Sequence, residues 1–280
     1  MNKDTSGQHP AEHPSYRLAF EDVDFLGKDD LRPLRLQLEL LKPEWYLRRA
    51  NVRSTVVVFG SARLLPIDDA ERQLAELIAV HGEHPADASR QRALAEARKV
   101  LQYAPYYNEA RKFGALVSER FQHEQRREFV VVTGGGPGIM EAANRGAHDV
   151  GSRSAGFNIQ LPHEQAPNPY ISEDLCFRFH YFALRKMHFL MRAKALLAFP
   201  GGYGTLDELF DVLTLIQTKK IACIPVVLVG KAFWRRAVDF DFLAEEGVIS
   251  HADAKLFSVV ETAEEAIHVL ESFYGGGPPP

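Results

Sequence analysis

The sequence has very little cysteine and no long apolar segment. Its 280 residues include two cysteines, Cys176 and Cys223, which lie far apart and outside any CxxC pair. Two such residues support neither a disulfide framework nor a zinc site, so we expect buried free thiols in a reducing compartment. No run of about 18 apolar residues occurs, and the polar N-terminus has no signal-peptide core. We therefore expect a cytoplasmic protein without a membrane partner.

An excess of basic residues is also missing. The 33 Lys and Arg residues are outnumbered by 37 Asp and Glu residues, which gives a formal net charge of −4. A chain of this charge offers no broad cationic surface to a nucleic-acid backbone, so we expect no nucleic-acid partner. Any anion that the protein binds must be held by a local site.

Three common nucleotide and metal motifs are absent as well. Without GxxxxGK[ST], the chain has no P-loop. The first glycine-rich turn is not GxGxxG, and the next predicted strand ends in Asn158-Ile159-Gln160-Leu161 without an acidic residue to hold an adenosine ribose, which disfavours a nicotinamide dinucleotide. Because no HExxH or comparable spacing occurs, we predict no metal ligands and no cofactor.

Short apolar runs alternate with helical patterns along the chain. The predicted strands are 55–59, 129–132, 156–161, 195–199, 225–229 and 256–260, and the predicted helices are 108–125, 138–150, 182–192, 205–217, 233–245 and 263–273. This alternation predicts an α/β fold, namely a Rossmann-like open parallel sheet with helices on both faces.

We expect one Rossmann-like domain over 54–274, with appendages. An N-terminal helical extension covers 17–53, and a helical insertion at about 64–105 surrounds a break at His84-Pro85. That insertion could pad a crossover, or it could serve as a lid or a partner surface. The tails, 1–16 and 275–280, are predicted to be disordered.

The N-terminal extension contains a predicted amphipathic helix over 31–49. Its leucines on one side are Leu31, Leu34, Leu38 and Leu41. We expect this helix to pack on the domain or on a second subunit.

Two glycine-rich turns each join a predicted strand to a predicted helix. The first, at 133–141, reads TGGGPGIME, and the second, at 199–208, reads FPGGYGTLDE. Backbone N–H groups in such turns converge on an anion, and the helix N-terminus that follows adds partial positive charge. Gly60 and Ser61 end the first strand at the same edge. Together these turns predict a site for a phosphate-bearing ligand at the carboxyl edge of the sheet.

Purely structural explanations remain open for these residues. Glycine turns can serve tight packing alone, and Thr205 with Glu208 fits the T-x-x-E capping box. Glu141 could be a solvated acid that favours its helix dipole, and Arg185 with Lys186 could be an exposed basic turn.

The longest motifs resemble the LOG (Lonely Guy) family. The segment 200–208 is similar to the family's PGGxGTxxE signature, 134–147 resembles GGGPGIMEAANRGA of its bacterial branch, and Arg185-Lys186 resembles the Arg-Lys pair upstream of PGG. The resemblance runs from about residue 54 to 245. It implies a Rossmann-fold hydrolase that cleaves the N-glycosidic bond of a nucleoside 5′-monophosphate, either AMP or a cytokinin riboside monophosphate, to a free base and ribose 5-phosphate.

The resemblance also implies roles for individual residues. Glu208 would stabilise an oxocarbenium-like state or orient water, and Arg185 would bind the substrate. The other predicted substrate-binding residues are Gly60, Ser61, Gly135, Gly136, Glu141, Lys186, Gly201, Gly202, Tyr203, Gly204, Thr205 and Asp207. Asp207 departs from the family's pattern, in which Glu is common at this position. The family further implies a homodimer or a dimer of dimers.

Two other classes of function remain open at this point. A non-catalytic nucleotide sensor would use the same turns without hydrolysis, and a scaffold protein would bind no nucleotide. The label "lysine decarboxylase", which many members of the family carry, is not supported, because nothing marks a lysine for a pyridoxal phosphate Schiff base.

Overall fold

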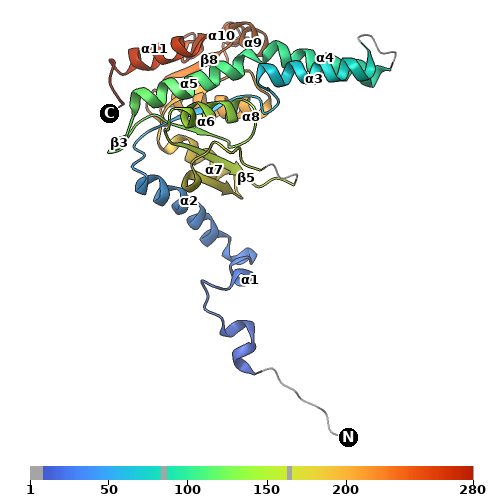
Figure 1. The fold of residues 1–280 in the computed structure, drawn as a ribbon. Helices are drawn as coiled ribbons and strands as arrows, with labels where there is room; N and C mark the ends of the chain where they lie inside the picture. The colour runs from blue at the N-terminus through green and yellow to red at the C-terminus, as the bar shows by residue number, and fades with distance from the viewer. Residues whose placement is uncertain (1–8, 83–86, 163–165, 280) are drawn as a thin grey trace.

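A seven-stranded parallel sheet forms the centre of the computed structural model, which describes residues 9–82, 87–162 and 166–279 (Figure 1). The strands are β1 (Thr55–Phe59), β4 (Val130–Thr133), β5 (Ser154–Ile159), β6 (Cys176–Phe179), β7 (Ala193–Ala198), β8 (Val226–Val229) and β9 (Ser258–Val260). Their order is β6-β5-β4-β1-β7-β8-β9, and every neighbouring pair is parallel. The Rossmann-like prediction is therefore confirmed, with β1 in the middle of the sheet.

Helices cover both faces of the sheet, because successive strand side chains point to opposite sides. In β1, Val56 and Val58 belong to one core, whereas Val57 and Phe59 belong to the other. The first core is closed by α5 (Pro105–Phe121), α6 (Ile139–Asp149) and α11 (Ala263–Phe273). The second is closed by α2 (Arg32–Arg49), α7 (Phe182–Met191), α8 (Tyr203–Gln217) and α9 (Lys231–Ala237).

Helices α5 and α6 approach each other closely through two glycines. A Cβ atom on Gly146 would lie 1.9 Å from the carbonyl oxygen of Arg111, and one on Gly114 would lie 2.2 Å from that of Ala143. Since both obstacles are backbone atoms, they cannot rotate away, and the helices would have to separate.

Replacement of Gly146 by alanine is therefore expected to lower the free energy of unfolding. Alanine favours a helix interior by about 1 kcal/mol, but the clash with backbone atoms should outweigh this gain and leave a net loss of about 2 kcal/mol. Urea denaturation measures the change, with Gly277→Ala as a control, because a Cβ at Gly277 meets nothing within 4 Å. An unchanged midpoint in Gly146→Ala would contradict the close approach.

The stretch predicted as an insertion contains α3 (Ile67–His81) and α4 (Ala88–Tyr103). The two helices pack against each other and project from the body of the domain (Figure 1). The predicted break at His84-Pro85 lies outside the described residues. No helix in the described part of the chain combines the length and hydropathy that crossing a bilayer requires.

The N-terminal segment extends away from the domain (Figure 1). It contains η1 (Pro10–Glu12), η2 (Pro14–Tyr16), α1 (Val23–Leu26) and η3 (Asp29–Leu31). Thus residues 10–16, for which the sequence predicts disorder, form two short 3₁₀ helices, each with proline in its first turn and an N-capping histidine side chain.

Helix α2 packs on the domain through a side other than the one that carries Leu34, Leu38 and Leu41. Pro43, Glu44 and Leu47 are buried against the domain, whereas Leu34, Leu38 and Leu41 are exposed. The helix therefore packs on the domain, as predicted, but through Pro43, Glu44 and Leu47 and not through the leucines at 34, 38 and 41. Packing of this helix on a second subunit stays a prediction.

Smaller elements complete the fold and correct several predicted boundaries. They are the β2–β3 hairpin (Gln122–His123 and Arg126–Arg127), η4 (Glu173–Leu175), α10 (Phe240–Glu245) and η5 (Asp253–Lys255). The helix predicted over 233–245 is two helices, because the Asp239 side chain accepts a hydrogen bond from Phe242 N and starts α10. Cys176 is half-buried but Cys223 is exposed, so the expectation of two buried thiols is wrong: Cys223 lies in the loop before β8.

Candidate functional site

Three loops meet at the carboxyl ends of β4, β1 and β7, which are neighbours in the sheet. The backbone holds them together: Ser61 N donates to the carbonyl oxygen of Pro200 at 2.9 Å, and Ile139 N donates to that of Ser61 at 3.1 Å. A cavity of about 630 Å³ opens between these loops. The strand order changes direction at β1, so the cavity lies at the switch point where open parallel sheets bind ligands.

Buried amide side chains hold the first glycine turn in place. Asn168 binds the carbonyl oxygens of both Gly135 and Gly136, through its N–H at 2.9 Å and its Nδ2 at 3.1 Å. It also donates to Asn144, which is fully buried and accepts the Thr133 hydroxyl. Because these polar groups satisfy one another, the turn is held in one conformation before any ligand binds.

Glycine is required in this turn by the backbone. Gly135 and Gly138 have φ of +75° and +72°. A Cβ on Gly138 would lie 2.3 Å from the carbonyl oxygen of Ser61. The close approach of the turn to the β1 loop thus depends on glycine.

The second turn leads directly into α8, whose N-terminus faces the cavity. Gly202 is its N-cap, and no side chain of the described residues caps it. A Cβ on Gly202 or Gly204 would meet nothing within 4 Å, so open space lies in front of the backbone at this point. An uncapped helix N-terminus beside open space is a ready anion site.

The capping-box explanation for Thr205 and Glu208 is wrong. Helix α8 begins at Tyr203, two residues before the predicted start, so Thr205 is already inside the first turn. Its N–H donates to the Gly202 carbonyl oxygen, and its side chain is buried against Gly201. Glu208 therefore lies one turn further along the helix, and it forms part of the cavity wall.

Glu208 and Arg185 form a buried pair in the cavity wall. Arg185 Nη2 lies 3.9 Å from Glu208 Oε1, and the side chains are 16% and 5% exposed. The Arg185 guanidinium lies over the rings of Phe182 and Phe189, and its buried Nε has no hydrogen-bond partner among the described residues. The Arg185 side chain thus lines the cavity with hydrogen-bonding capacity that the described residues leave unused.

Burial raises the pKa of Glu208 to about 7, although the positive charges of Lys186 and Arg185 oppose the shift; Asp207 and Asp211 add to it. Burial also lowers the pKa of Arg185. The site thus keeps a carboxyl group poised to ionise near neutral pH, which is common among catalytic groups.

The raised pKa of Glu208 predicts that the free energy of unfolding falls as the pH rises. The stabilising contribution of Glu208 is fully present below its unfolded-state pKa of 4.5 and is lost as the pH rises through about 7. The full loss is on the order of 3 kcal/mol. Glu208→Gln should therefore be more stable than the parent in urea at pH 8.5 but similar at pH 4.5. Equal stability at both pH values would contradict the shift.

The cavity includes most, but not all, of the residues predicted from the sequence. Those that line it are Gly60, Ser61, Gly136, Arg185, Gly202, Tyr203, Gly204, Thr205 and Glu208. Gly135 and Gly201 are not in the lining; a Cβ there would clash with the side chains of Asn158 and Thr205, respectively.

Three predicted residues point elsewhere. Glu141 accepts a hydrogen bond from the Tyr107 hydroxyl at 2.8 Å. Lys186 binds Asp207 at 2.7 Å, in a shallower hollow on the outer side of α8. Direct substrate contact by these three side chains stays a prediction, without a place in the cavity lining.

Several lining residues were not predicted from the sequence. They are Phe59, Ala62, Arg63, Asn158, Ile159, Leu161, Phe182 and Phe189; Gly134 and Met140 also line the cavity, and they lie in the predicted first glycine turn but were not named as site residues. Position alone could have indicated two of them, because Arg63 and Asn158 follow or end strands at the same edge as the glycine turns. No motif or pattern in the sequence indicates that Asn168 holds the first glycine turn.

The fold and the site define a Rossmann-like α/β protein with a crevice between glycine turns at its switch point. A family model described as "Possible lysine decarboxylase" matches residues 140–270. The chain belongs to this family, the LOG family, since a relative that is 30% identical is matched over two thirds of its length.

Three plant relatives illustrate the similarity. Cytokinin riboside 5′-monophosphate phosphoribohydrolase LOG3 of Arabidopsis thaliana is 30% identical over 148 residues, which are 51% of this chain and 67% of the relative. The LOG2 enzyme of the same plant is 27% identical over 53% of this chain and 70% of its own, and LOG of Oryza sativa subsp. japonica is 30% identical over 51% and 60%. An alignment with the crystal structure of TM1055 covers 78% of this chain and 99% of that one, with a TM-score of 0.47 and 18% identity.

The residues of the cavity do not fit the cofactor that the family description implies. Pyridoxal phosphate is held as a Schiff base by a lysine. No lysine is among the described residues that line the cavity, and Lys186, on the next position after Arg185, pairs with Asp207 outside it.

Proposed function

We propose that the protein hydrolyses the N-glycosidic bond of a nucleoside 5′-monophosphate, releasing the base and ribose 5-phosphate. The observation that carries this proposal is the juxtaposition of the uncapped N-terminus of α8 with the buried pair of Glu208 and Arg185 in one cavity. The plant relatives are named for this type of reaction on cytokinin riboside 5′-monophosphates. AMP and cytokinin riboside monophosphates are the substrates proposed here.

The N-terminus of α8 is the proposed phosphate site. Backbone N–H groups around Gly202 and Gly204, together with the helix dipole, suit an anion and leave room for its oxygens. The cavity is within the volume range of small-molecule sites. Its apolar lining, which includes Met140, Leu161 and Phe182, offers a surface for a flat base.

Glu208 is the proposed electrostatic catalyst. As the bond from C1′ to the base nitrogen breaks, the ribose gains oxocarbenium character and the base gains negative charge. An ionised Glu208 would stabilise the ribose and orient a water, whose oxygen bonds to C1′ and whose proton neutralises the departing base. Arg185, which lines the same cavity, would bind the substrate beside it.

A panel of nucleotides tests the proposal. Purified protein is incubated with AMP, GMP, CMP, UMP and a cytokinin riboside monophosphate, and free base and ribose 5-phosphate are quantified by chromatography. We expect equimolar products from at least one nucleotide, and none from adenosine, which lacks the phosphate.

Two outcomes would replace the proposal. A rise in melting temperature with AMP but no product would favour a nucleotide sensor. No thermal shift and no product with any nucleotide would leave the scaffold alternative. Lysine with pyridoxal phosphate, included in the same assay, is expected to give no cadaverine.

A further inference from the structure

Helix α2 contacts α7, the helix that carries Arg185, at both of its ends. The two backbone N–H groups just before α7 belong to His180 and Tyr181, and both donate to Glu39 Oε1 at 2.9 Å. Tyr181 is the N-cap of α7 and has no capping side-chain bond of its own. Glu39 thus holds the chain at its entry into α7 and satisfies the N–H of the N-cap residue, which has no partner inside the helix.

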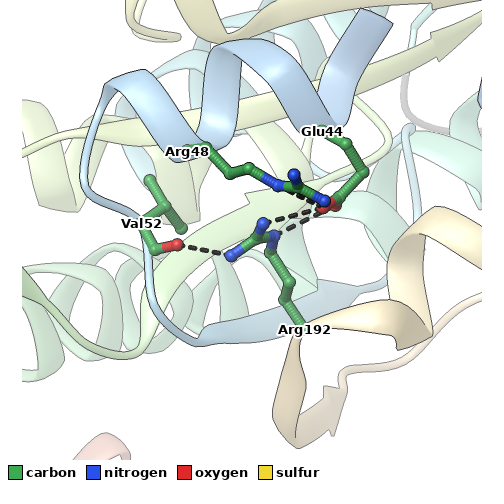
Figure 2. Close-up of polar contacts among 4 residues, drawn as sticks. All are labelled: Glu44, Arg48, Val52 and Arg192. Carbon is green, nitrogen blue, oxygen red and sulfur yellow. Dashed lines mark hydrogen bonds and ion pairs between the residues drawn. The ribbon is translucent and has the colours of Figure 1, made fainter. Parts of the chain in front are cut away.

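The other end of α7 is held by an ion pair. Arg192, the C-cap residue, donates from Nε and Nη2 to the two carboxylate oxygens of Glu44 at 3.0 and 2.7 Å (Figure 2). Its third nitrogen donates to the carbonyl oxygen of Val52 at 2.7 Å, and Arg48 lies on the other side of the same carboxylate (Figure 2). A planar guanidinium that is bound at three points fixes both distance and orientation.

A short chain of bonds links this contact to the site. Tyr181, held through its N–H by Glu39, accepts the backbone N–H of Arg185 with its carbonyl oxygen at 3.2 Å. At the far end, the carbonyl oxygen of Arg192 accepts Thr55 N, the first residue of β1. Both ends of α7 are therefore fixed relative to β1, and the cavity opens at the carboxyl end of β1.

We propose that Glu39 and Glu44 of α2 are positioning residues, which set the place of α7 and thereby of Arg185 against Glu208. This rests on the proposed function. Neither carboxylate is in the cavity lining, so both act through α7. Arg185 already stands at 3.9 Å from Glu208, and a displacement of about 1 Å in a catalytic geometry can cost on the order of a hundredfold in rate.

The central test compares Glu39→Ala with Glu39→Gln, which keeps the acceptor oxygen. Glu39→Ala should lower kcat/KM by about tenfold, and Glu39→Gln should stay within about twofold of the parent. Gln37→Ala, an exposed residue of the same helix, is the matched control and should have parental kinetics.

Two readouts separate positioning from general weakening of the fold. In Glu39→Ala the acidic limb of the pH profile of kcat/KM should move to higher pH, because Arg185 and Lys186, both on α7, move away from Glu208 while Asp207 and Asp211 on α8 stay near it. The amides of His180 and Tyr181 should also exchange hydrogen faster, whether or not the protein is active.

The outcomes are distinct. Faster exchange with parental kcat/KM and an unshifted pH profile overturns the positioning role, and unchanged exchange overturns the contact itself. If the parent protein hydrolyses no nucleotide, the proposed function fails, and the affinity for AMP is measured by calorimetry instead. Weaker binding in Glu39→Ala that Glu39→Gln restores then supports positioning, whereas equal affinity in all variants overturns it.

Discussion

Replacement of Glu208 by glutamine is expected to reduce kcat for base release by about a thousandfold, while the affinity for AMP stays within about threefold. The amide fills the same buried position but cannot carry the negative charge that an oxocarbenium-like state requires. Loss of one preorganised electrostatic group costs on the order of 10² to 10³ in kcat. Single-turnover release of base measures the first effect and calorimetry the second.

Glu141→Gln is the matched control for this experiment. It makes the same chemical change at a carboxylate that accepts the Tyr107 hydroxyl and is not in the cavity lining. Near-parental turnover is expected. A large loss in Glu141→Gln would support the sequence-based prediction that Glu141 binds substrate, and parental turnover in Glu208→Gln would exclude Glu208 as the catalytic carboxylate.

Replacement of Arg185 by alanine is expected to have the second-largest effect. We expect kcat/KM to fall by about a hundredfold, since a buried charged donor to the substrate is worth roughly 2 to 3 kcal/mol. The assay is made at pH 9, well above the Glu208 pKa of about 7. This choice minimises the indirect effect of the Arg185 charge on the ionisation of the carboxyl group.

Lys186→Ala separates direct contact from charge in the same experiment. Lys186 adjoins Arg185 in sequence but pairs with Asp207 outside the cavity, and its charge lowers the pKa of Glu208. At pH 9 its loss should change kcat/KM by less than about threefold, and at pH 6 by more, because less Glu208 is ionised. If Lys186→Ala at pH 9 matches Arg185→Ala, Lys186 binds the substrate as the sequence predicts.

The class of fold and the edge of the sheet that carries the site were predictable from the sequence. Apolar runs and helical patterns with a period near 3.6 are local signals, and β1 with its two neighbours satisfies them strongly. Glycine turns between a strand and a helix are also recognisable in the sequence. At Gly138, for example, only glycine readily adopts the φ of +72° and allows the close approach to Ser61. The short edge strand β6, where Phe177 and Phe179 alternate with exposed Arg178, gave a weaker signal and was not predicted.

What the tertiary structure alone decided is which side chains share the cavity and which do not. The sequence places Arg185 and Lys186 side by side, yet helix geometry sends the first towards Glu208 and the second to Asp207. It gives no sign that Asn168 holds the first glycine turn, or that Glu39 and Glu44 hold the two ends of α7. Local conformation depends mainly on neighbouring residues, whereas the burial of side chains, their shifted pKa values and the contacts between distant segments arise only once the whole chain has packed.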